Sequence, residues 1–246
     1  LQNAPTPKER QQMEDAILLH RANAHYRPFW NSSASRLGLS RIEIELPAAI
    51  ARRRKAAKEF GGTAAMPGLD ITVQLEALRR AVAYEARQGL YKNRSELMIP
   101  IRCSTLANDE ESMRFVSALA EIPETFRSML VIEVTDAPTD PRALKAAWDT
   151  SGFQAMRHIR SRMVLQVPHM DLHLAASVAS MLYGLSVPLP SRSGVGNKSL
   201  AVVLHNFRAF AQAAGLVTFA DGADSIGQAQ AAAAAGIDWI AGTAIH

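Results

Sequence analysis

The chain has 246 residues, of which 48% are hydrophobic and 20% are charged, a composition that is typical of a packed globular protein and excludes a disordered or membrane-spanning one. Its formal net charge is only +4, and we expect no nucleic-acid polymer as a partner. A single cysteine, Cys103, excludes an internal disulfide and a thiolate metal cluster, and it fits a reducing compartment.

No stretch approaches the roughly 20 consecutive apolar residues that a bilayer-spanning helix needs. No leader with the features of a signal peptide opens the chain. We therefore expect no membrane span in this segment and a cytoplasmic location. The chain starts at Leu1 rather than at a methionine, which suggests that it is a piece of a longer protein with further segments upstream.

Short apolar or β-branched runs alternate along the chain with longer helical patterns, which predicts parallel strands joined by crossover helices. We expect a helix within residues 1–24 that leads into a single barrel domain over residues 25–246, because no linker or internal repeat divides the chain. The predicted strands cover residues 25–29, 41–46, 97–103, 130–135, 163–167, 185–187, 216–220 and 237–241. This alternation indicates an α/β fold of the TIM (β/α)8 type.

The connection between the first two predicted strands, residues 30–40, is polar and rich in serine. Parallel neighbours need a connection of about a dozen residues or more, and usually a helix. We therefore predict that the first strand runs antiparallel, which makes this a modified TIM barrel.

Helix start and stop signals fall in the gaps between the predicted strands. The predicted N-caps are Asp70, Asn108 with Glu111, Asp140 with Pro141, and Ser225 with Gln228, and the predicted ends lie before Gly89, Gly215 and Gly236. Between the last two of these starts, Val203, Phe207 and Phe210 are spaced to line one face of a helix.

Much of the positive charge lies in one short segment that contains Arg52, Arg53, Arg54, Lys55 and Lys58. On a helix, these side chains could form a patch for an acidic partner or for phosphates. A solvated helix face is the interpretation we favour, because the run is short and no aromatic residues interrupt it.

Four segments together are similar to the EAL family of cyclic di-GMP phosphodiesterases. Residues 25–29 (HYRPF) resemble the opening "YQPI" strand of these domains, and residues 132–136 (IEVTD) resemble their "EITE" strand. Residues 219–225 (FADGADS), with Gln228, resemble "AEGVET..Q", and residues 236–242 (GIDWIAG) resemble the closing "G(C/V)DYIQG" strand. Order and spacing agree from Tyr26 to Gly242, and the family's barrel also has an inverted first strand.

In that family, carboxylates and an asparagine at the barrel mouth hold two divalent cations, Mg²⁺ or Mn²⁺, which activate the water that attacks the phosphodiester. The resemblance places the equivalent pocket positions of this chain at Glu43, Arg102, Glu133, Gln166, Val167, Pro188, Asp221, Asp224 and Ala241. Glu45 is the alternative to Glu43, because two registers of that strand fit the name-giving motif.

Most of these positions lack the side chain that the resemblance requires. Arg102 occupies the position of the asparagine, and Gln166 and Val167 occupy the positions of paired aspartates. Pro188 and Pro190 replace a lysine and an aspartate, and Ala241 replaces a glutamine. Pro47 replaces an arginine that helps to hold the dinucleotide. Glu133 is retained, and Asp221 and Asp224 replace glutamates by shorter carboxylates. Cations of this kind need about six oxygen ligands, so we expect no metal cofactor and no catalytic residue. A buried carboxylate without a metal needs another partner, and we predict an ion pair between Glu133 and Arg102.

Two further motifs allow a functional and a structural interpretation. His169, Asp171 and His173 have spacing that suits a metal site only in an extended backbone, and we favour the start of a helix with Asp171 as its N-cap. The glycine-rich residues 194–199, with Arg192 and Lys198, could bind an anion at a helix N-terminus, but a solvated loop is the interpretation we favour. Gln228 is either a family signature or part of a capping box.

The sequence therefore predicts a catalytically inactive EAL-like domain that acts in cyclic di-GMP-related signalling by binding a protein partner. The alternatives are a receptor that binds cyclic di-GMP without cleaving it, and an active phosphodiesterase with rearranged ligands. The sequence leaves undecided whether the chain forms a homodimer.

Overall fold

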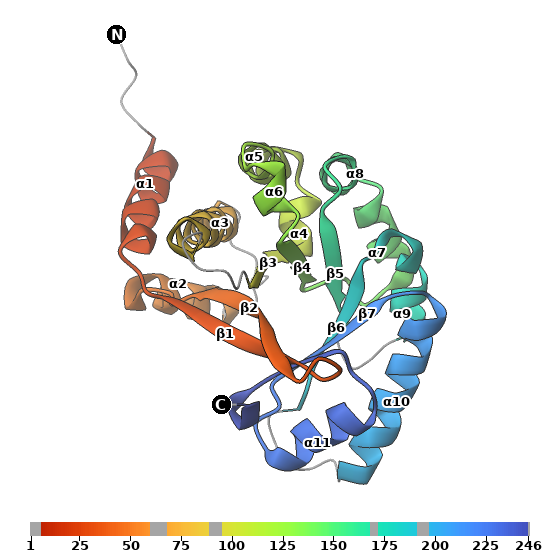
Figure 1. Ribbon diagram of the computed structural model, residues 1–246. Coiled ribbons are helices and arrows are strands. Elements are labelled where there is room, and N and C mark those ends of the chain that lie inside the picture. Colours follow the sequence, from red (N-terminus) through yellow and green to blue (C-terminus); the bar gives the residue numbers. More distant parts are fainter. Residues whose placement is uncertain (1–5, 60–67, 89–94, 168–171, 191–196, 246) are drawn as a thin grey trace.

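The protein forms a barrel of strands surrounded by helices (Figure 1). The computed structural model describes residues 6–59, 68–88, 95–167, 172–190 and 197–245, and within them eight strands close in chain order into one barrel. These strands are β1 (Ala24–Asn31), β2 (Arg36–Ile44), β3 (Glu96–Arg102), β4 (Leu130–Thr135), β5 (Arg162–Gln166), β6 (Gly184–Pro188), β7 (Val217–Asp221) and β8 (Trp239–Ala241). The predicted α/β barrel is confirmed, and each predicted strand overlaps one of these.

The first strand runs against its neighbours, as predicted. β1 pairs with β2 and with β8 in antiparallel fashion, whereas β2 through β8 pair in parallel. The hairpin is tighter than the sequence indicated, because β1 extends to Asn31 and β2 begins at Arg36. Residues 32–35 alone make the turn, and Ser35 adopts a φ of 49° there.

The helices fill the connections between strands and pack around the outside of the barrel (Figure 1). They are α1 (Pro7–His20), α2 (Ala48–Glu59), α3 (Leu69–Gln88), α4 (Cys103–Leu106), α5 (Asp109–Ala120), α6 (Glu124–Arg127), α7 (Pro141–Trp148), α8 (Ser151–His158), α9 (Leu172–Ala176), α10 (Asn197–Ala213) and α11 (Ile226–Ala234), with the short 3₁₀ turns η2 (Ala179–Met181) and η3 (Thr243–Ile245). None of the helices within the described ranges is long and apolar enough to cross a lipid bilayer.

The capping signals were read correctly at three of the four predicted helix starts. Asn108 and Asp140 accept hydrogen bonds from the first turns of α5 and α7, and Ser225 forms a reciprocal capping box with Gln228 at α11. The predicted cap at Asp70 was wrong: this residue lies inside the first turn of α3 and is buried. Its carboxylate is instead used in ion pairs with Arg54 and Arg102.

Two other helix predictions need correction. Glu111 does not complete a capping box with Asn108, because its carboxylate accepts a hydrogen bond (2.5 Å) from the backbone N–H of Gly68. On α10, Phe207 is fully buried and Phe210 partly so, but Val203 is 43% exposed and does not belong to the buried face.

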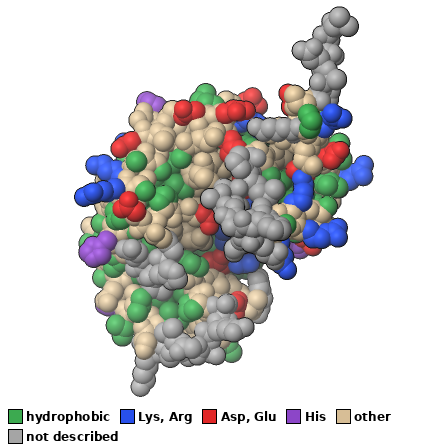
Figure 2. All heavy atoms as spheres, turned by 180° about the vertical axis from the view of Figure 1, so that it is seen from behind, with side chains coloured by type: hydrophobic (Ala, Val, Ile, Leu, Met, Phe, Trp, Pro, Cys, Tyr) green, Lys and Arg blue, Asp and Glu red, His purple; other side chains and the backbone are tan. Residues whose placement is uncertain are grey.

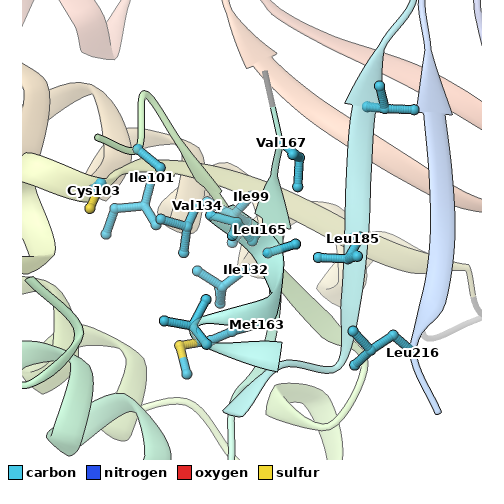
Figure 3. Packing of buried hydrophobic residues seen from close by; sticks show 14 of the residues in the cluster. Ile99, Ile101, Cys103, Ile132, Val134, Met163, Leu165, Val167, Leu185 and Leu216 are labelled. Atoms are coloured by element: carbon cyan, nitrogen blue, oxygen red, sulfur yellow. The ribbon is translucent and has the colours of Figure 1, made fainter. Parts of the chain in front are cut away.

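Two apolar layers hold the barrel together. The outer layer lies between the strands and the helices, and Figure 3 shows part of it, with Ile99, Ile132, Leu165 and Leu185 projecting from successive strands. Cys103 belongs to this layer, where burial raises the pKa of its thiol to about 12. The inner layer fills the middle of the barrel and consists of Phe29, Leu39, Met98, Val131, Val164, Phe219 and Ala241.

The N-terminal helix α1 packs against α3, and basic side chains gather on the side of the molecule that carries α1 and α2 (Figure 2). The favoured interpretation of the basic segment in α2 was only partly right. Arg53 pairs with Asp15 of α1, and Arg54 pairs with Asp70 of α3, so these two arginines attach α2 to its neighbours. Lys55 is exposed.

Candidate functional site

A cluster of charged side chains lies at the mouth of the barrel, where the parallel strands end. Because side chains alternate across a strand, one set from each strand points into the barrel. At the carboxyl end this inner set includes Arg41 and Glu43 of β2, Glu133 of β4 and Asp221 of β7. β1 runs in the opposite direction and places Arg27 directly across from Arg41.

Glu133 is the deepest member of the cluster, and its side chain is 0% exposed. Nη2 of Arg41 lies 2.9 Å from Oε2 of Glu133 in an ion pair. Burial raises the pKa of Glu133 above its ordinary value, although the charge of Arg41 and the hydroxyl of Ser186 act in the opposite direction. Neither Glu133 oxygen, nor the hydroxyl of Ser186, has a well-formed hydrogen bond to another described group.

Two guanidinium groups connect the carboxylates of the cluster. Arg41 Nη1 lies 2.7 Å from Oδ2 of Asp221 and 3.9 Å from Oε1 of Glu43. Arg27 donates to Oδ1 of Asp221 at 2.9 Å and to Oε2 of Glu43 at 3.1 Å. Each arginine therefore contacts more than one carboxylate, and each carboxylate contacts at least one arginine.

The charges of this cluster nearly cancel within the protein. Burial acts to lower the pKa of Arg27, but its hydrogen bond to Asp221 and the nearby carboxylates outweigh this effect and raise the pKa. Arg27 thus stays charged. Two arginines face three carboxylates, so the positive and negative charges of the cluster are nearly equal in number.

These residues do not fit a pair of divalent cations. Mg²⁺ binds its oxygen ligands at about 2.0–2.1 Å and keeps near-octahedral geometry, so a cation here would have to displace the guanidinium of Arg41. That group is 13% exposed and is held by Glu133 and Asp221. Within the described ranges, no group of three or more His, Cys, Asp or Glu side chains is arranged to hold a metal ion.

The structure brings together three of the residues expected at the pocket, Glu43, Glu133 and Asp221. It also decides between the two registers of β2, because Glu45 lies beyond the strand and is exposed, with Asn23 and His25 as its partners.

The remaining expected positions lie around the mouth or outside it. Gln166 ends β5 within the inner set, whereas Val167 is buried in the outer apolar layer (Figure 3). Pro188 ends β6 and is exposed, and Ala241 belongs to the inner apolar layer. Asp224 is exposed and accepts hydrogen bonds from the backbone and hydroxyl of Thr243.

The predicted ion pair between Arg102 and Glu133 is wrong. The register of β3 and β4 pairs Glu133 with Pro100 and places Arg102 opposite Thr135, one full pleat closer to the rim. From there Arg102 reaches outward to Asp136 at 2.8 Å and to Asp70 at 3.0 Å. Its pKa is raised, because these two carboxylates outweigh the effect of burial.

Several other candidates lie outside the described residues: His169, Asp171, Arg192 and most of the glycine-rich segment. His173 lies in α9, and Asn197 opens α10, but the side chain of Lys198 is not among those described. Gln228 completes the capping box of α11 and also donates to the backbone oxygen of Pro190 at 2.8 Å.

The sequence interpretation missed the two residues that dominate the site, Arg27 and Arg41. A signal was present, since Arg41 and Glu43 alternate with the buried Ile42 and the partly buried Ile44. Arg27 likewise lies two residues before the inner Phe29. Two arginines with inward parity near the mouth predict cations inside the barrel.

No family model matches the sequence, and no curated protein is similar to it in sequence. Several solved structures are similar in fold. The FimX EAL domain of Xanthomonas citri, solved in complex with c-diGMP, has a TM-score of 0.65 and 15% identity over 94% of this chain and 89% of that one. LapD of Vibrio cholerae, bound to c-di-GMP, has a TM-score of 0.71 and 11% identity over 100% of this chain and 59% of that one.

A third structure, the PaMucR phosphodiesterase in complex with c-di-GMP, has a TM-score of 0.62 and 13% identity over 90% of this chain and 94% of that one. The first two structures are named for their EAL domains, and the third is named for its phosphodiesterase activity and its ligand. The chain therefore has the fold of the EAL domains, as its sequence resemblance predicted.

Proposed function

We propose that this chain is a catalytically inactive EAL-like domain that acts in cyclic di-GMP-related signalling by binding a protein partner. The observation that carries the proposal is the pairing of Arg27 and Arg41 with Glu43, Glu133 and Asp221. The carboxylates that remain from the expected metal site are bound to internal cations, so the protein neutralises them without Mg²⁺ or Mn²⁺.

The chemistry of hydrolysis supports the same conclusion. Two-metal catalysis needs cations that clamp the attacking and the leaving oxygen and that lower the pKa of a water. Arg102 supplies no oxygen ligand and is paired with Asp70 and Asp136, and neither Gln166 nor Pro188 supplies a carboxylate. Loss of a single electrostatic group at a reacting centre costs about a hundredfold or more in rate, and here several groups are replaced.

Exposed apolar side chains support the choice of a protein partner. Met13 and Ile17 lie one turn apart on α1 and are 59% and 55% exposed, and Ile226 at the start of α11 is 70% exposed. Exposed apolar side chains that lie together, as Met13 and Ile17 do, are a feature of surfaces that contact another protein. The same surfaces would serve a second copy of this chain.

A receptor that binds cyclic di-GMP without cleaving it is the second candidate. It is favoured by the similar folds that were solved with this dinucleotide. Arg27, which is 38% exposed at the mouth, is a cation that could meet a phosphate. Against this candidate, the arginine is already bound by Glu43 and Asp221.

A calorimetric titration with cyclic di-GMP and Mg²⁺ or Mn²⁺, with chromatography of the product, distinguishes these functions. We expect neither heat of binding nor linear dinucleotide at concentrations up to about 100 μM, where a ligand that binds with micromolar affinity is saturated. Binding without turnover would establish the receptor. Turnover would overturn both candidates.

A double variant, Arg27→Met with Arg41→Met, tests the observation itself. Removing both cations leaves three carboxylates facing one another, which should create affinity for a hard cation. We expect Mn²⁺ titrated into the variant and followed by electron paramagnetic resonance to show at least about tenfold tighter binding than in the natural chain, equivalent to about 1.4 kcal/mol. The matched control is Arg114→Gln, an exposed arginine on α5. Equal Mn²⁺ affinity in all three proteins would contradict the proposal.

A further inference from the structure

A cavity lies at the amino-terminal end of the barrel, opposite the charged mouth. It has a volume of about 750 Å³ and is lined by residues that include Arg36, Gly38, Glu96, Tyr183, Asp238 and Trp239. These residues come from the β1–β2 hairpin and from the starts of β3, β6 and β8. Pockets for small molecules range from about 300 to 1,000 Å³, so one small ligand fits.

This cavity is separate from the charged mouth. Tyr183, Val217 and Trp239, which line it, pack against the inner apolar layer. That layer, which includes the buried Phe29, Leu39 and Phe219, fills the barrel between its two ends. A ligand at the amino-terminal end therefore touches none of the residues of the mouth.

Two aromatic side chains in the cavity are held in place by their neighbours. The guanidinium of Arg162 lies 5.2 Å from the centre of the Tyr183 ring, and its Nη1 donates to Glu96 at 2.7 Å. The Trp239 indole lies against Gly38, where an added Cβ would come within 3.2 Å of the ring. Aromatic side chains that are held in this way offer flat faces for stacking at little entropic cost.

The charges of the lining leave one cation without a partner. Glu96 is neutralised by Arg162, and Asp238 accepts hydrogen bonds from Thr218 and pairs with Arg208 at 3.3 Å. Arg36 is exposed at the rim and has no ion pair or side-chain hydrogen bond within the ranges that the structure describes. The cavity thus combines aromatic faces with the exposed guanidinium of Arg36, whereas Nε and Nη2 of Arg162, which also have no hydrogen-bond partner among the described groups, are buried.

From this combination we propose that the amino-terminal cavity binds a small molecule that carries a flat aromatic ring and one anionic group. The ring stacks on Trp239 or Tyr183, and the anion accepts hydrogen bonds from Arg36. Guanidinium groups bind carboxylates and phosphates in a bidentate manner, so the anion is of this planar or tetrahedral oxygen type.

The probe is indole-3-acetate, with indole-3-acetamide as its neutral counterpart, titrated into the natural chain and followed by calorimetry and by the indole N–H signal of Trp239. We expect the acid to bind at least about tenfold more tightly than the amide, because a hydrogen bond to a charged group contributes that much. Arg36→Gln should remove this preference and leave binding of the amide unchanged. Arg114→Gln, the exposed control, should leave both affinities unchanged.

A second variant locates the site. Gly38→Val adds bulk to the cavity wall, against the Trp239 ring, and we expect it to weaken both probes by about tenfold or more. The unfolding midpoint in urea shows whether the barrel is intact. The proposal fails if neither probe binds at millimolar concentration, if the acid and the amide bind equally, or if Arg36→Gln keeps the preference. Should Gly38→Val not fold, the Arg36→Gln result alone decides.

Discussion

The two ends of the barrel differ in how their charged side chains are paired. At the carboxyl end, Arg27 and Arg41 are bound by three carboxylates, and Glu133 beneath them is fully buried. At the amino-terminal end, Glu96 and Asp238 are paired with arginines, and the exposed Arg36 at the rim can bind a ligand. In most TIM barrels the chemistry takes place at the carboxyl end, and the other end contributes stability. Here a cavity of about 750 Å³ lies at the amino-terminal end.

The mouth shows how buried carboxylates are accommodated inside a barrel. A carboxylate without a partner is costly to bury, and the guanidinium of Arg41 supplies the opposite charge to Glu133 and Asp221. The inner apolar layer keeps the two ends independent, so changes at the mouth need not alter the cavity at the other end.

The largest expected effect comes from the layer between the two ends. Phe219 is 1% exposed and meets Phe29 edge to face, with ring centres 6.2 Å apart. Phe219→Ala should lower the free energy of unfolding by about 3–5 kcal/mol, because it removes buried contacts and leaves a cavity. Urea unfolding followed by circular dichroism measures this loss. Ile226→Ala, at an exposed position, should change stability by less than about 0.5 kcal/mol, and equal effects would mean that the layer is not a packed core.

The next effect concerns the mouth. Arg41→Met leaves Glu133 and Asp221 without their shared cation and should lower the free energy of unfolding by about 3 kcal/mol, as for other broken buried ion pairs. Arg27→Met, whose side chain is 38% exposed, should cost less than about 1 kcal/mol because solvent screens its charge.

A double variant tests whether the loss in Arg41→Met comes from the buried carboxylate. Arg41→Met with Glu133→Leu replaces the pair by apolar groups and should recover most of the stability. If the double variant is as unstable as the sum of its single changes, the two side chains do not act as a pair.

A smaller effect is the pH dependence that Glu133 introduces. Its pKa in the folded state lies above the ordinary value of 4.5, so its protonation favours the folded state. This contribution is complete below pH 4.5 and is lost as the pH rises through the raised pKa. Glu133→Gln does not titrate, and the free energy of unfolding of the variant, relative to the natural chain, should therefore increase as the pH is raised from about 4 to 8. A difference that stays constant over this range, measured by urea unfolding in matched buffers, would show that Glu133 keeps its ordinary pKa.

The smallest effect is expected at the amino-terminal cavity. Gly38→Ala places a methyl group 3.2 Å from the Trp239 ring, and a shift of the ring by a few tenths of an ångström relieves this contact. The free energy of unfolding should change by less than about 1 kcal/mol. The tryptophan fluorescence of the protein should change, and the variant Trp239→Phe shows how much of that fluorescence comes from Trp239. A larger loss of stability would mean that the cavity wall cannot adjust.

Most of the fold could be predicted from local patterns in the sequence. The strand runs, the short first connection and the caps at Asn108, Asp140 and Ser225 are local signals, and each was read correctly. The cap at Asp70 was misread because this carboxylate is used by Arg54 and Arg102, which come from distant segments. A local pattern cannot show such a competing partner.

The site was harder to predict, because it depends on the stagger between strands. The sequence places Glu133 and Arg102 on neighbouring strands, but the register separates them by a pleat. Arg41 reaches Glu133 although β2 and β4 are not neighbours. Strands in a closed barrel are tilted and staggered, so a side chain can meet one two strands away, and only the closed structure gives that distance.

The seam between β8 and β1 has a kinetic consequence. Only two residue pairs join these strands, Trp30 with Ile240 and Asn31 with Trp239, whereas β3 and β4 share a ladder of six pairs. Short ladders open first in native-state hydrogen exchange, so the amides at this seam should exchange faster than those of β3 and β4. The β1–β2 hairpin carries Arg27 and Arg41 toward one end and Gly38 toward the other, and each opening of the seam would displace both ends of the barrel at once.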